Sequence, residues 1–358
     1  MKNLDLQNEI IIRDMEEVYR APNINWSIIS NATFYISGAA GMLASYFVFY
    51  LIYLNEIHGY SIKIYANIRN KDKAYNRYGE LLNKPYFQLV AENSLINDIK
   101  DVNYIIHAAS LASPQYFGKM PVETLIPNVV GTYELLEAAR KMDCFKGFLF
   151  FSSGSVYGNV GAIAEGISEE VQGTLNFLDN GNSYAEGKRC GEALCHAYAS
   201  EYNVRTLSVR IHHSYGPTMD IENDKRAFSE FVRNVTEGKN IVLKSNGRAK
   251  RAFCYLTDAI KGLFTTLLYG NSGEVYNMGN PLQYYEIGEI AEKLVKLSQN
   301  EKIKVVCEER RDEGYKLSPE SNSRVVPTNI DKLKSLGWSP TVGIEEGFLR
   351  VIEYFKVD

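Results

Sequence analysis

A tyrosine and a lysine four positions apart, Tyr184 and Lys188, are the residues whose types and spacing most directly suggest chemistry. On a helix, side chains at this spacing lie on one face, a single turn from each other. A free phenol is a poor base at neutral pH, because its unperturbed pKa is about 10. A nearby ammonium favours the phenolate by Coulomb attraction, more strongly where water is excluded. Such a pair can exchange a proton with the oxygen of an alcohol or a ketone. Taken alone the pair is weak, because the chain contains 25 Tyr.

A glycine motif near the start of the chain adds weight to this interpretation. Residues 32–37 are a β-type run, Gly38 and Gly41 follow in a short turn, and an apolar helix then begins with Met42 and Leu43. Gly38 permits a tight turn, and Gly41 lets a pyrophosphate approach the positive end of the helix. Strand, glycine turn and helix in this order predict a dinucleotide site, with a simple glycine-rich turn as the alternative. A dinucleotide would carry the hydride that accompanies proton exchange at the phenol.

The end of the next predicted strand, residues 61–68, bears on the choice of dinucleotide. A free ribose 2′-hydroxyl is usually met there by Asp or Glu, and a 2′-phosphate by Arg. This chain offers Asn67 and Arg69. We therefore expect NADP rather than NAD, with a solvated run of charges as the alternative explanation for Arg69.

Two further buried-type strands end in residues suited to such a site. Residues 104–110 end in His107, Ala108 and Ala109, and the small alanines leave room for a flat cofactor ring. We interpret His107 as a structural residue rather than an acid or base. The strand at 148–151 leads to Ser153. A hydroxyl at the carboxyl end of a parallel strand is well placed to hydrogen-bond a reacting oxygen.

Composition excludes several classes of function. The 358 residues carry a net charge of −4 with a pI near 5.9, so we expect neither nucleic acid nor an anionic membrane as a partner. The five Cys lack C-x-x-C spacing and suggest reduced thiols in the cytoplasm. The apolar run at 43–54 is too short to cross a bilayer and predicts a buried helix. The adjacent His212 and His213 would point to opposite faces of a strand, so we expect no metal site.

The chain divides into three parts. Residues 1–31 form an N-terminal extension, helical in pattern, which we expect to pack over the first strand. Residues 32–216 are predicted to form the dinucleotide-binding domain, including a helix at 134–140. Residues 217–358 are predicted to form mainly a ligand-binding lobe, with some segments returning to the first sheet and an amphipathic helix at 344–355 closing the core. Arginines concentrate in this last part and suggest a diphosphate clamp or a solvated patch: Arg226, Arg233, Arg248 and Arg251.

Several of these motifs occur in one order along the chain: Gly38…Gly41, His107-Ala108-Ala109, Ser152-Ser153, Tyr184…Lys188 and Arg210…Tyr215-Gly216-Pro217. Together they resemble the extended short-chain dehydrogenase/reductase family, in its nucleotide-sugar epimerase/dehydratase branch. The resemblance covers roughly residues 30–356, and the sequence around Lys188 and Arg251 is similar in style to UDP-glucuronate decarboxylases. It implies an α/β fold, with a doubly wound parallel Rossmann sheet that carries NAD or NADP. A smaller C-terminal α/β lobe would bind a nucleoside diphosphate sugar.

The resemblance also implies roles for single residues. Tyr184 would be the general acid/base, with Lys188 holding the nicotinamide ribose and lowering the pKa of Tyr184. Ser153 would hydrogen-bond the sugar oxygen at carbon 4. The substrate would also meet Ser155, His213, Arg251 and Arg324, with the two arginines at the diphosphate. A homodimer that makes sugars for surface polysaccharides is the expected biological form.

Two departures from the family pattern decide between reactions. Ser155 stands where the dehydratases and decarboxylases carry an acidic residue, and His213 replaces a usual Asn. A hydroxyl is too weak a base for the dehydration, which argues against a dehydratase and weakens a decarboxylase. Because Arg69 and the absence of an acid after the second strand favour NADPH, we favour a 4-keto-sugar reductase. A 4-epimerase that retains NAD is the main alternative, and a decarboxylase-like enzyme is a further one. A non-catalytic NAD(P)-binding protein is disfavoured, because Ser153, Tyr184 and Lys188 are all present.

Overall fold

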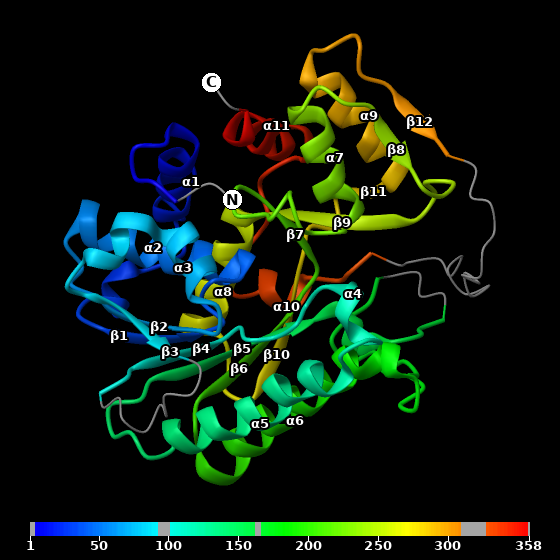
Figure 1. Ribbon diagram of the computed structural model, residues 1–358. Helices are drawn as coiled ribbons and strands as arrows, with labels where there is room; N and C mark the ends of the chain where they lie inside the picture. The colour runs from blue at the N-terminus through cyan, green and yellow to red at the C-terminus, as the bar shows by residue number, and fades with distance from the viewer. Residues whose placement is uncertain (1–3, 92–100, 162–165, 309–326, 357–358) are drawn as a thin grey trace.

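The computed structural model describes residues 4–91, 101–161, 166–308 and 327–356. Its centre is a seven-stranded sheet with helices on both faces (Figure 1). The strand order is β10-β6-β5-β4-β1-β2-β3, and all neighbouring pairs are parallel. This confirms the doubly wound α/β fold expected from the sequence. The strands are β1 (Thr33–Ser37), β2 (Lys63–Ile68), β3 (Phe87–Ala91), β4 (Tyr104–His107), β5 (Gly147–Ser153), β6 (Thr206–Ile211) and β10 (Glu274–Met278).

Helices α5 (Pro121–Ala139) and α6 (Ser183–Tyr202) cover one face of the sheet (Figure 1). Helix α5 is much longer than the helix expected at 134–140. The predicted start of this helix was therefore wrong. Its first residue is Pro121, and a proline costs nothing there because the first N–H groups of a helix have no partner. Pro127 lies inside the helix, and its carbonyl accepts a hydrogen bond from the His107 ring.

Helices α2 (Met42–His58) and α8 (Leu256–Tyr269) lie on the opposite face. Every residue of α2 from Leu43 to Leu54 is buried, as expected for a helix that is apolar on all sides. Phe47 of α2 stacks on Phe264 of α8 with ring centroids 4.3 Å apart. The buried helix expected at 43–54 is confirmed. Within the described residues, none of the helices combines the length and the apolar character needed to cross a membrane.

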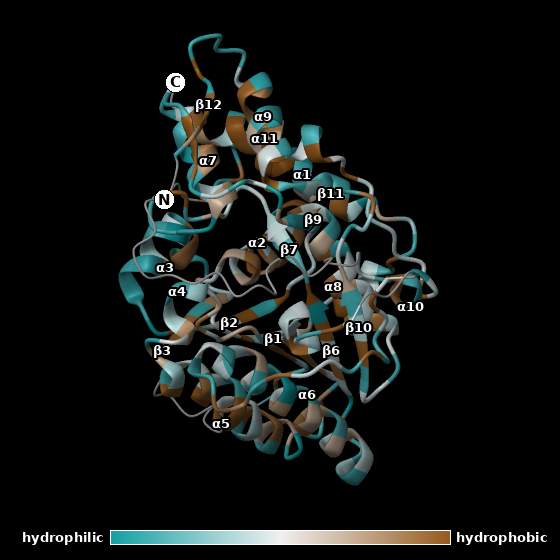
Figure 2. Ribbon diagram, turned by 90° about the vertical axis from the view of Figure 1, so that its right-hand side faces the viewer, coloured by the Kyte–Doolittle hydropathy of each residue, from teal (hydrophilic) through white to brown (hydrophobic). Residues whose placement is uncertain are grey.

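A smaller lobe lies above the large sheet, at the upper right of Figure 1. It contains a three-stranded sheet, β11-β9-β7, and a two-stranded sheet, β12-β8. The chain returns from this lobe to the large sheet as β10, and α11 has the bounds expected from its amphipathic pattern. Apolar residues gather on the central strands and inner helices, whereas the outer segments are hydrophilic (Figure 2). The elements are β7 (His213–Tyr215), β8 (Ile241–Leu243), β9 (Lys250–Tyr255), β11 (Tyr284–Glu286), β12 (Val305–Cys307), α7 (Ala227–Thr236), α9 (Ile287–Ser298) and α11 (Ile344–Phe355).

The N-terminal extension forms α1 (Glu9–Tyr19), which begins at an Asn8 cap. It packs mainly against α8 and α11 and hydrogen-bonds to α2. The expectation that it covers β1 was wrong, because the fully apolar α2 already covers that part of the sheet. The shorter helices are α3 (Lys71–Tyr78), α4 (Pro114–Phe117) and α10 (Asp331–Lys334).

Helix α6 approaches both β5 and α5 very closely, and one glycine on each side makes this possible. A Cβ atom on Gly191 would lie 2.3 Å from Cζ of the buried Phe150 on β5. A Cβ atom on Gly187 would lie 3.2 Å from Cβ of Asn128 on α5. A larger side chain at Gly191 would force the helix away from the sheet.

We therefore expect Gly191→Ala to lower the free energy of unfolding by about 1–3 kcal/mol, the usual cost of overpacking a core. Denaturant titration measures this directly. Gly118→Ala is the matched control, because a Cβ atom there meets nothing within 4 Å. Equal stability of the two variants would contradict the close packing of α6 on β5.

Candidate active site

The first turns of α6 carry Tyr184 and Lys188, which both face the sheet and are buried. The ring of Phe117, from α4, stacks on the Tyr184 ring with a centroid distance of 4.6 Å and an interplanar angle of 2°. Ser183 donates a hydrogen bond to the Phe117 carbonyl at 3.0 Å. These contacts fix the Tyr184 ring in one orientation.

Lys188 is directed at β5 rather than at the phenol oxygen. Its Nζ donates to the Phe151 carbonyl at 2.5 Å and lies 4.7 Å from the Phe150 ring centroid, against 5.6 Å for the Tyr184 ring. Burial lowers the pKa of Lys188 to about 7, although the charge of Glu192 raises it. The ammonium therefore titrates near neutral pH, where it can change charge during a reaction.

The pKa of Tyr184 is set by burial and by two neighbours. Burial raises it above its ordinary value, while a hydrogen bond with Ser153 and the positive charge of Arg226 lower it. The Nζ of Lys188 lies 5.6 Å from the Tyr184 ring centroid and donates its hydrogen bond to the Phe151 carbonyl.

Ser153 lies at the carboxyl end of β5, half-buried beside Tyr184. Its Oγ accepts hydrogen bonds from the N–H and the hydroxyl of Ser155, at 3.2 and 3.0 Å. Ser155 itself is exposed. The two serines and the tyrosine thus place three polar groups around one position at the edge of the sheet.

A buried ion pair anchors this end of β5. Ser152 donates a hydrogen bond to Glu192 of α6, and Arg210 of β6 pairs with the same carboxylate at 2.8 Å. The Arg210 guanidinium also lies 4.7 Å from the ring centroid of Tyr157. A buried carboxylate is costly without partners, so Glu192 holds β5, β6 and α6 in register below Ser153.

The glycine turn after β1 provides a cradle for a dinucleotide. Gly38 has a φ of +67°, and a Cβ atom on it would lie 2.7 Å from the backbone of Ala109. Gly41 caps α2 without any side-chain hydrogen bond, so the first N–H groups of the helix, including those of Met42 and Leu43, are available to an anion. These residues fit the pyrophosphate of NAD or NADP.

His107 lies at the end of β4 with both ring nitrogens committed within the protein. Nε2 must donate to the Pro127 carbonyl at 2.9 Å, because a carbonyl only accepts, and Nδ1 therefore accepts from the Ser37 hydroxyl at 2.6 Å. Burial lowers its pKa to about 3, so the ring is neutral at working pH. It holds Ser37 and the neighbouring Ala108 and Ala109 against the glycine turn, which supports the structural role expected for it.

The end of β2 presents a group of cations. Arg69 is exposed there, whereas Asn67 is buried and donates to the Ala91 carbonyl at 3.1 Å. Lys73 of α3 lies near enough for Arg69 to lower its pKa, after the larger effects of burial and Arg77. The sequence predicted a role for Arg69 but not for Lys73. Lys73 comes close to Arg69 only because helix α3 begins shortly after Arg69.

On the side of the small lobe, His213 and Arg251 come together on paired strands. His213 of β7 is in register with Phe253 of β9, and burial and then the charge of Arg251 lower the pKa of His213 to about 3. Arg251 is half-buried, and its Nη1 donates to the Lys250 carbonyl at 2.7 Å. Arg324 lies outside the described residues.

From the sequence, Arg226 could be identified only as one of several arginines in the last part of the chain. Its Nε donates to Asp224 at 2.7 Å, and its Nη2 lies 4.0 Å from the Met42 sulfur in the cofactor turn. Its charge lowers the pKa of both Tyr184 and His213. Arg226 therefore stands between the cofactor turn, the phenol and the small lobe. Arg226 is far from Met42 and Tyr184 in the sequence, so the sequence alone could not predict that these residues lie close together.

Comparison with known sequences agrees with this geometry. The model of the NAD dependent epimerase/dehydratase family matches residues 34–279. UDP-glucuronic acid decarboxylase 1 of Xenopus tropicalis is 29% identical over 322 residues, which is 90% of this chain and 71% of that protein. UDP-glucuronic acid decarboxylase 6 of Arabidopsis thaliana is 29% identical over 331 residues, which is 92% of this chain and 90% of that protein.

Solved structures share the fold. The UDP-glucose 4-epimerase of Thermotoga maritima, solved with UDP-glucose, has a TM-score of 0.74 at 22% identity and covers 90% of this chain and 98% of its own. The dTDP-glucose 4,6-dehydratase of Bacillus anthracis, solved with NAD, has a TM-score of 0.71 at 22% identity and covers 90% of this chain and 96% of its own.

Three buried histidines, His107, His212 and His213, predict how stability depends on pH. Burial lowers the pKa of His107 and His213 to about 3 and of His212 to about 4. Unfolded histidines titrate near pH 6.5 and folded ones far below, so their stabilisation is complete above about pH 6.5 and is lost as the pH falls. Each contributes up to about 1.4 kcal/mol per pH unit in that window.

We expect the free energy of unfolding to fall by about 4 kcal/mol between pH 7.5 and pH 5.5, as measured by denaturant titration. His107→Gln should reduce this loss by about a third, because one of the three groups is removed. A free energy of unfolding that stays constant or rises on acidification would contradict the burial of these rings in the neutral form.

Proposed function

The chain belongs to the NAD dependent epimerase/dehydratase family, and from that premise we propose that it oxidises or reduces carbon 4 of a nucleoside diphosphate sugar. The reaction that we favour is reduction of a 4-keto sugar by NADPH. The observation that carries the proposal is the convergence of Tyr184, Ser153 and Lys188 beside the glycine turn.

Each of these side chains has a task at carbon 4. When bound, the dinucleotide supplies the hydride. Tyr184 gives its proton to the oxygen at carbon 4 as the ketone becomes an alcohol. Ser153 hydrogen-bonds the same oxygen and orients it toward Tyr184. Lys188, whose Nζ lies 5.6 Å from the Tyr184 ring centroid, stabilises as an ammonium the phenolate that remains after the proton has left.

The turn that follows Ser153 supports reduction rather than dehydration. Removing a proton from carbon 5 needs a base such as a carboxylate, and Ser155 offers only a hydroxyl. A reduction needs no such base, because the phenol and the dinucleotide supply both the proton and the hydride.

Cations at the end of β2 support NADPH as the reductant. Arg69 and Lys73 lie where an adenosine 2′-phosphate is usually met, and neither Asn67 nor Ile68 brings a negative charge to repel it. On the substrate side, Arg251, His213 and Arg324 are the residues that we propose to bind the nucleoside diphosphate.

Decarboxylation of a nucleoside diphosphate uronic acid is a second candidate, which the sequence relatives favour. A ketone at carbon 4 makes the uronate a β-keto acid, which loses carbon dioxide without a protein base. Arg251 and Arg226 both lie near enough to His213 to lower its pKa, and either could meet a substrate carboxylate, although Arg226 also pairs with Asp224. The cofactor would then be oxidised again as the ketone is reduced, with no net consumption.

Product analysis separates these reactions. Purified protein is incubated with UDP-glucuronic acid, UDP-glucose and a dTDP-4-keto-6-deoxyhexose, each with and without NADPH, and products are identified by mass spectrometry and NMR. We expect turnover of the keto sugar only, and only with NADPH. Carbon dioxide and a UDP-pentose would establish the decarboxylase instead. Interconversion of 4-hydroxyl epimers without added reductant would establish an epimerase.

Tyr184→Phe removes the proton donor and leaves the ring packing against Phe117 unchanged. We expect turnover to fall at least about a hundredfold, the low end for a positioned acid/base, while cofactor affinity survives. Tyr202→Phe, at the exposed far end of α6, is the control and should be neutral. Near-normal turnover of the Tyr184→Phe enzyme would remove Tyr184 from the mechanism.

Arg69→Ala tests the cofactor preference. One phosphate–arginine contact is worth about 1.5–3 kcal/mol, so the affinity for NADPH should fall by a factor of roughly 10 to 150 while that for NADH stays constant. Titration calorimetry with both cofactors measures the ratio, with Lys63→Ala, at the start of the same strand, as the control. A preference for NADH in the unmodified protein would overturn the choice of NADPH.

A further inference from the structure

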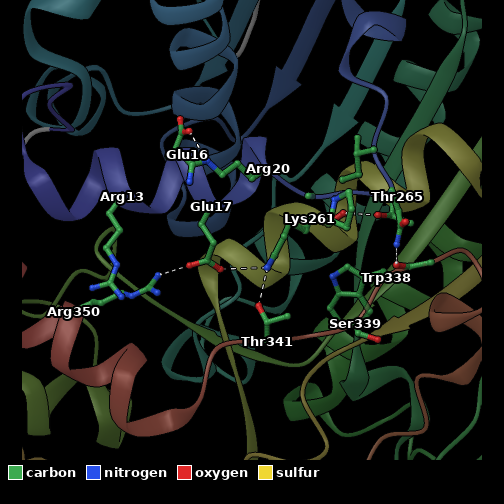
Figure 3. A pocket seen from close by; sticks show the side chains of 15 residues that line it. Arg13, Glu16, Glu17, Arg20, Lys261, Thr265, Trp338, Ser339, Thr341 and Arg350 are labelled. Atoms are coloured by element: carbon green, nitrogen blue, oxygen red, sulfur yellow. Dashed lines mark hydrogen bonds and ion pairs between the residues drawn. The ribbon is translucent and has the colours of Figure 1, made fainter.

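The N-terminal extension lies outside the family match, which begins at residue 34. Helix α1 nevertheless joins the two parts of the protein, because it packs against α8 and α11 and hydrogen-bonds to α2 (Figures 1 and 3). The extension brings charged side chains into the interior of the protein.

Asp14 of α1 is fully buried and receives hydrogen bonds from three different elements. Tyr46 of α2 donates at 2.6 Å, Tyr255 at the end of β9 donates at 2.6 Å, and Arg350 of α11 donates at 2.7 Å. An unpaired buried carboxylate is strongly unfavourable, so these three donors must stay together around Asp14. One carboxylate therefore ties one element of the cofactor domain to two elements of the lobe.

Glu17, one helical turn further along α1, makes a second set of ties. It accepts hydrogen bonds from Thr257 at 3.0 Å and from Arg350 at 2.8 Å. It also pairs with Lys261 at 3.3 Å, and Figure 3 shows its contacts with Arg350 and Lys261. Glu17, Lys261 and Arg350 line an open cavity of about 640 Å³ between α1, α8 and residues 337–341. Its four cations all have carboxylate partners in the protein, namely Arg13–Glu346, Arg20–Glu16, Lys261–Glu17 and Arg350–Asp14. The charges at this junction serve to join elements.

The two tyrosines on Asp14 stand close to opposite sides of the candidate active site. Tyr46 lies one turn after Met42, at the end of α2 that forms the dinucleotide cradle. Tyr255 lies four residues after Arg251 on β9, which pairs with the strand that carries His213. Through Asp14, the substrate strand is held at a fixed position relative to the cofactor helix.

We propose that α1 is a clasp that fixes β9 relative to α2, and that Asp14 is its positioning residue. Losing one of the two tyrosine bonds loosens β9 without touching a catalytic group. The substrate part of this proposal rests on the proposed function, whereas the mechanical part does not.

Tyr255→Phe tests the clasp by removing the bond on the side of the lobe. We expect the KM for the nucleotide sugar to rise at least about fivefold, with kcat and the cofactor affinity within about twofold of the unmodified enzyme. The matched control is Tyr53→Phe, which also removes a tyrosine–carboxylate bond between α2 and α1, the bond to Glu16 at 2.5 Å. That bond does not reach the lobe, so this variant should lose stability but keep its KM.

Hydrogen–deuterium exchange tests the clasp without any substrate. In Tyr255→Phe, the amides of β7 and β9 should exchange at least about tenfold faster, while those of β1 and β5 keep their rates. If the chain does not fold, Asp14→Asn carries the same expectation with the side-chain shape preserved. Equal exchange on β9 in the Tyr255→Phe and Tyr53→Phe variants would overturn the clasp. Faster exchange on β9 with no nucleotide-sugar turnover in any variant would leave the clasp standing and overturn the proposed function instead.

Discussion

The close approach of α6 to β5 is the constraint on which the candidate site depends. Gly191 lets the helix backbone reach the Phe150 ring, and that approach brings Lys188 within hydrogen-bonding distance of the Phe151 carbonyl. Tyr184 is then carried, one turn earlier on the same helix, to the end of the strand where Ser153 lies. Burial follows from the same packing, and burial is what moves the pKa of Lys188 toward neutrality. A looser helix would leave both groups solvated, with ordinary pKa values and no shared geometry.

Buried ionic groups fix the positions of the elements around this site. Glu192 joins α6 to β5 and β6 through Ser152 and Arg210, and Asp14 joins α1 to α2, β9 and α11. Apolar contacts tolerate small shifts, whereas a buried carboxylate that loses a donor pays the full cost of desolvation. Carboxylates of this kind specify where one element stands relative to another. They lie at the joints between elements, Glu192 beside β5 and Asp14 beside β9.

Much of the sheet could be predicted from the sequence, because its strands are short apolar runs between turn residues and its dinucleotide motif is local. Helix α11 could also be predicted, because its apolar residues repeat with the helical period. The sequence did not reveal β3, where apolar and exposed residues mix, or the true start of α5, which begins at Pro121 and contains Pro127. It also did not reveal the position of Arg226 or the role of Asp14. Both depend on contacts between segments far apart in the chain, and an aspartate in an amphipathic helix normally faces water.

The central claim is that hydride passes from external NADPH to carbon 4 of a keto sugar while Tyr184 supplies the proton. Deuterium labelling tests it most directly: the protein is incubated with a nucleoside diphosphate 4-keto sugar and NADPH deuterated at the transferable position of the nicotinamide. The account predicts a product with one deuterium, located by NMR at carbon 4. A product that forms without deuterium at carbon 4, or forms equally well with no reduced cofactor present, would contradict it.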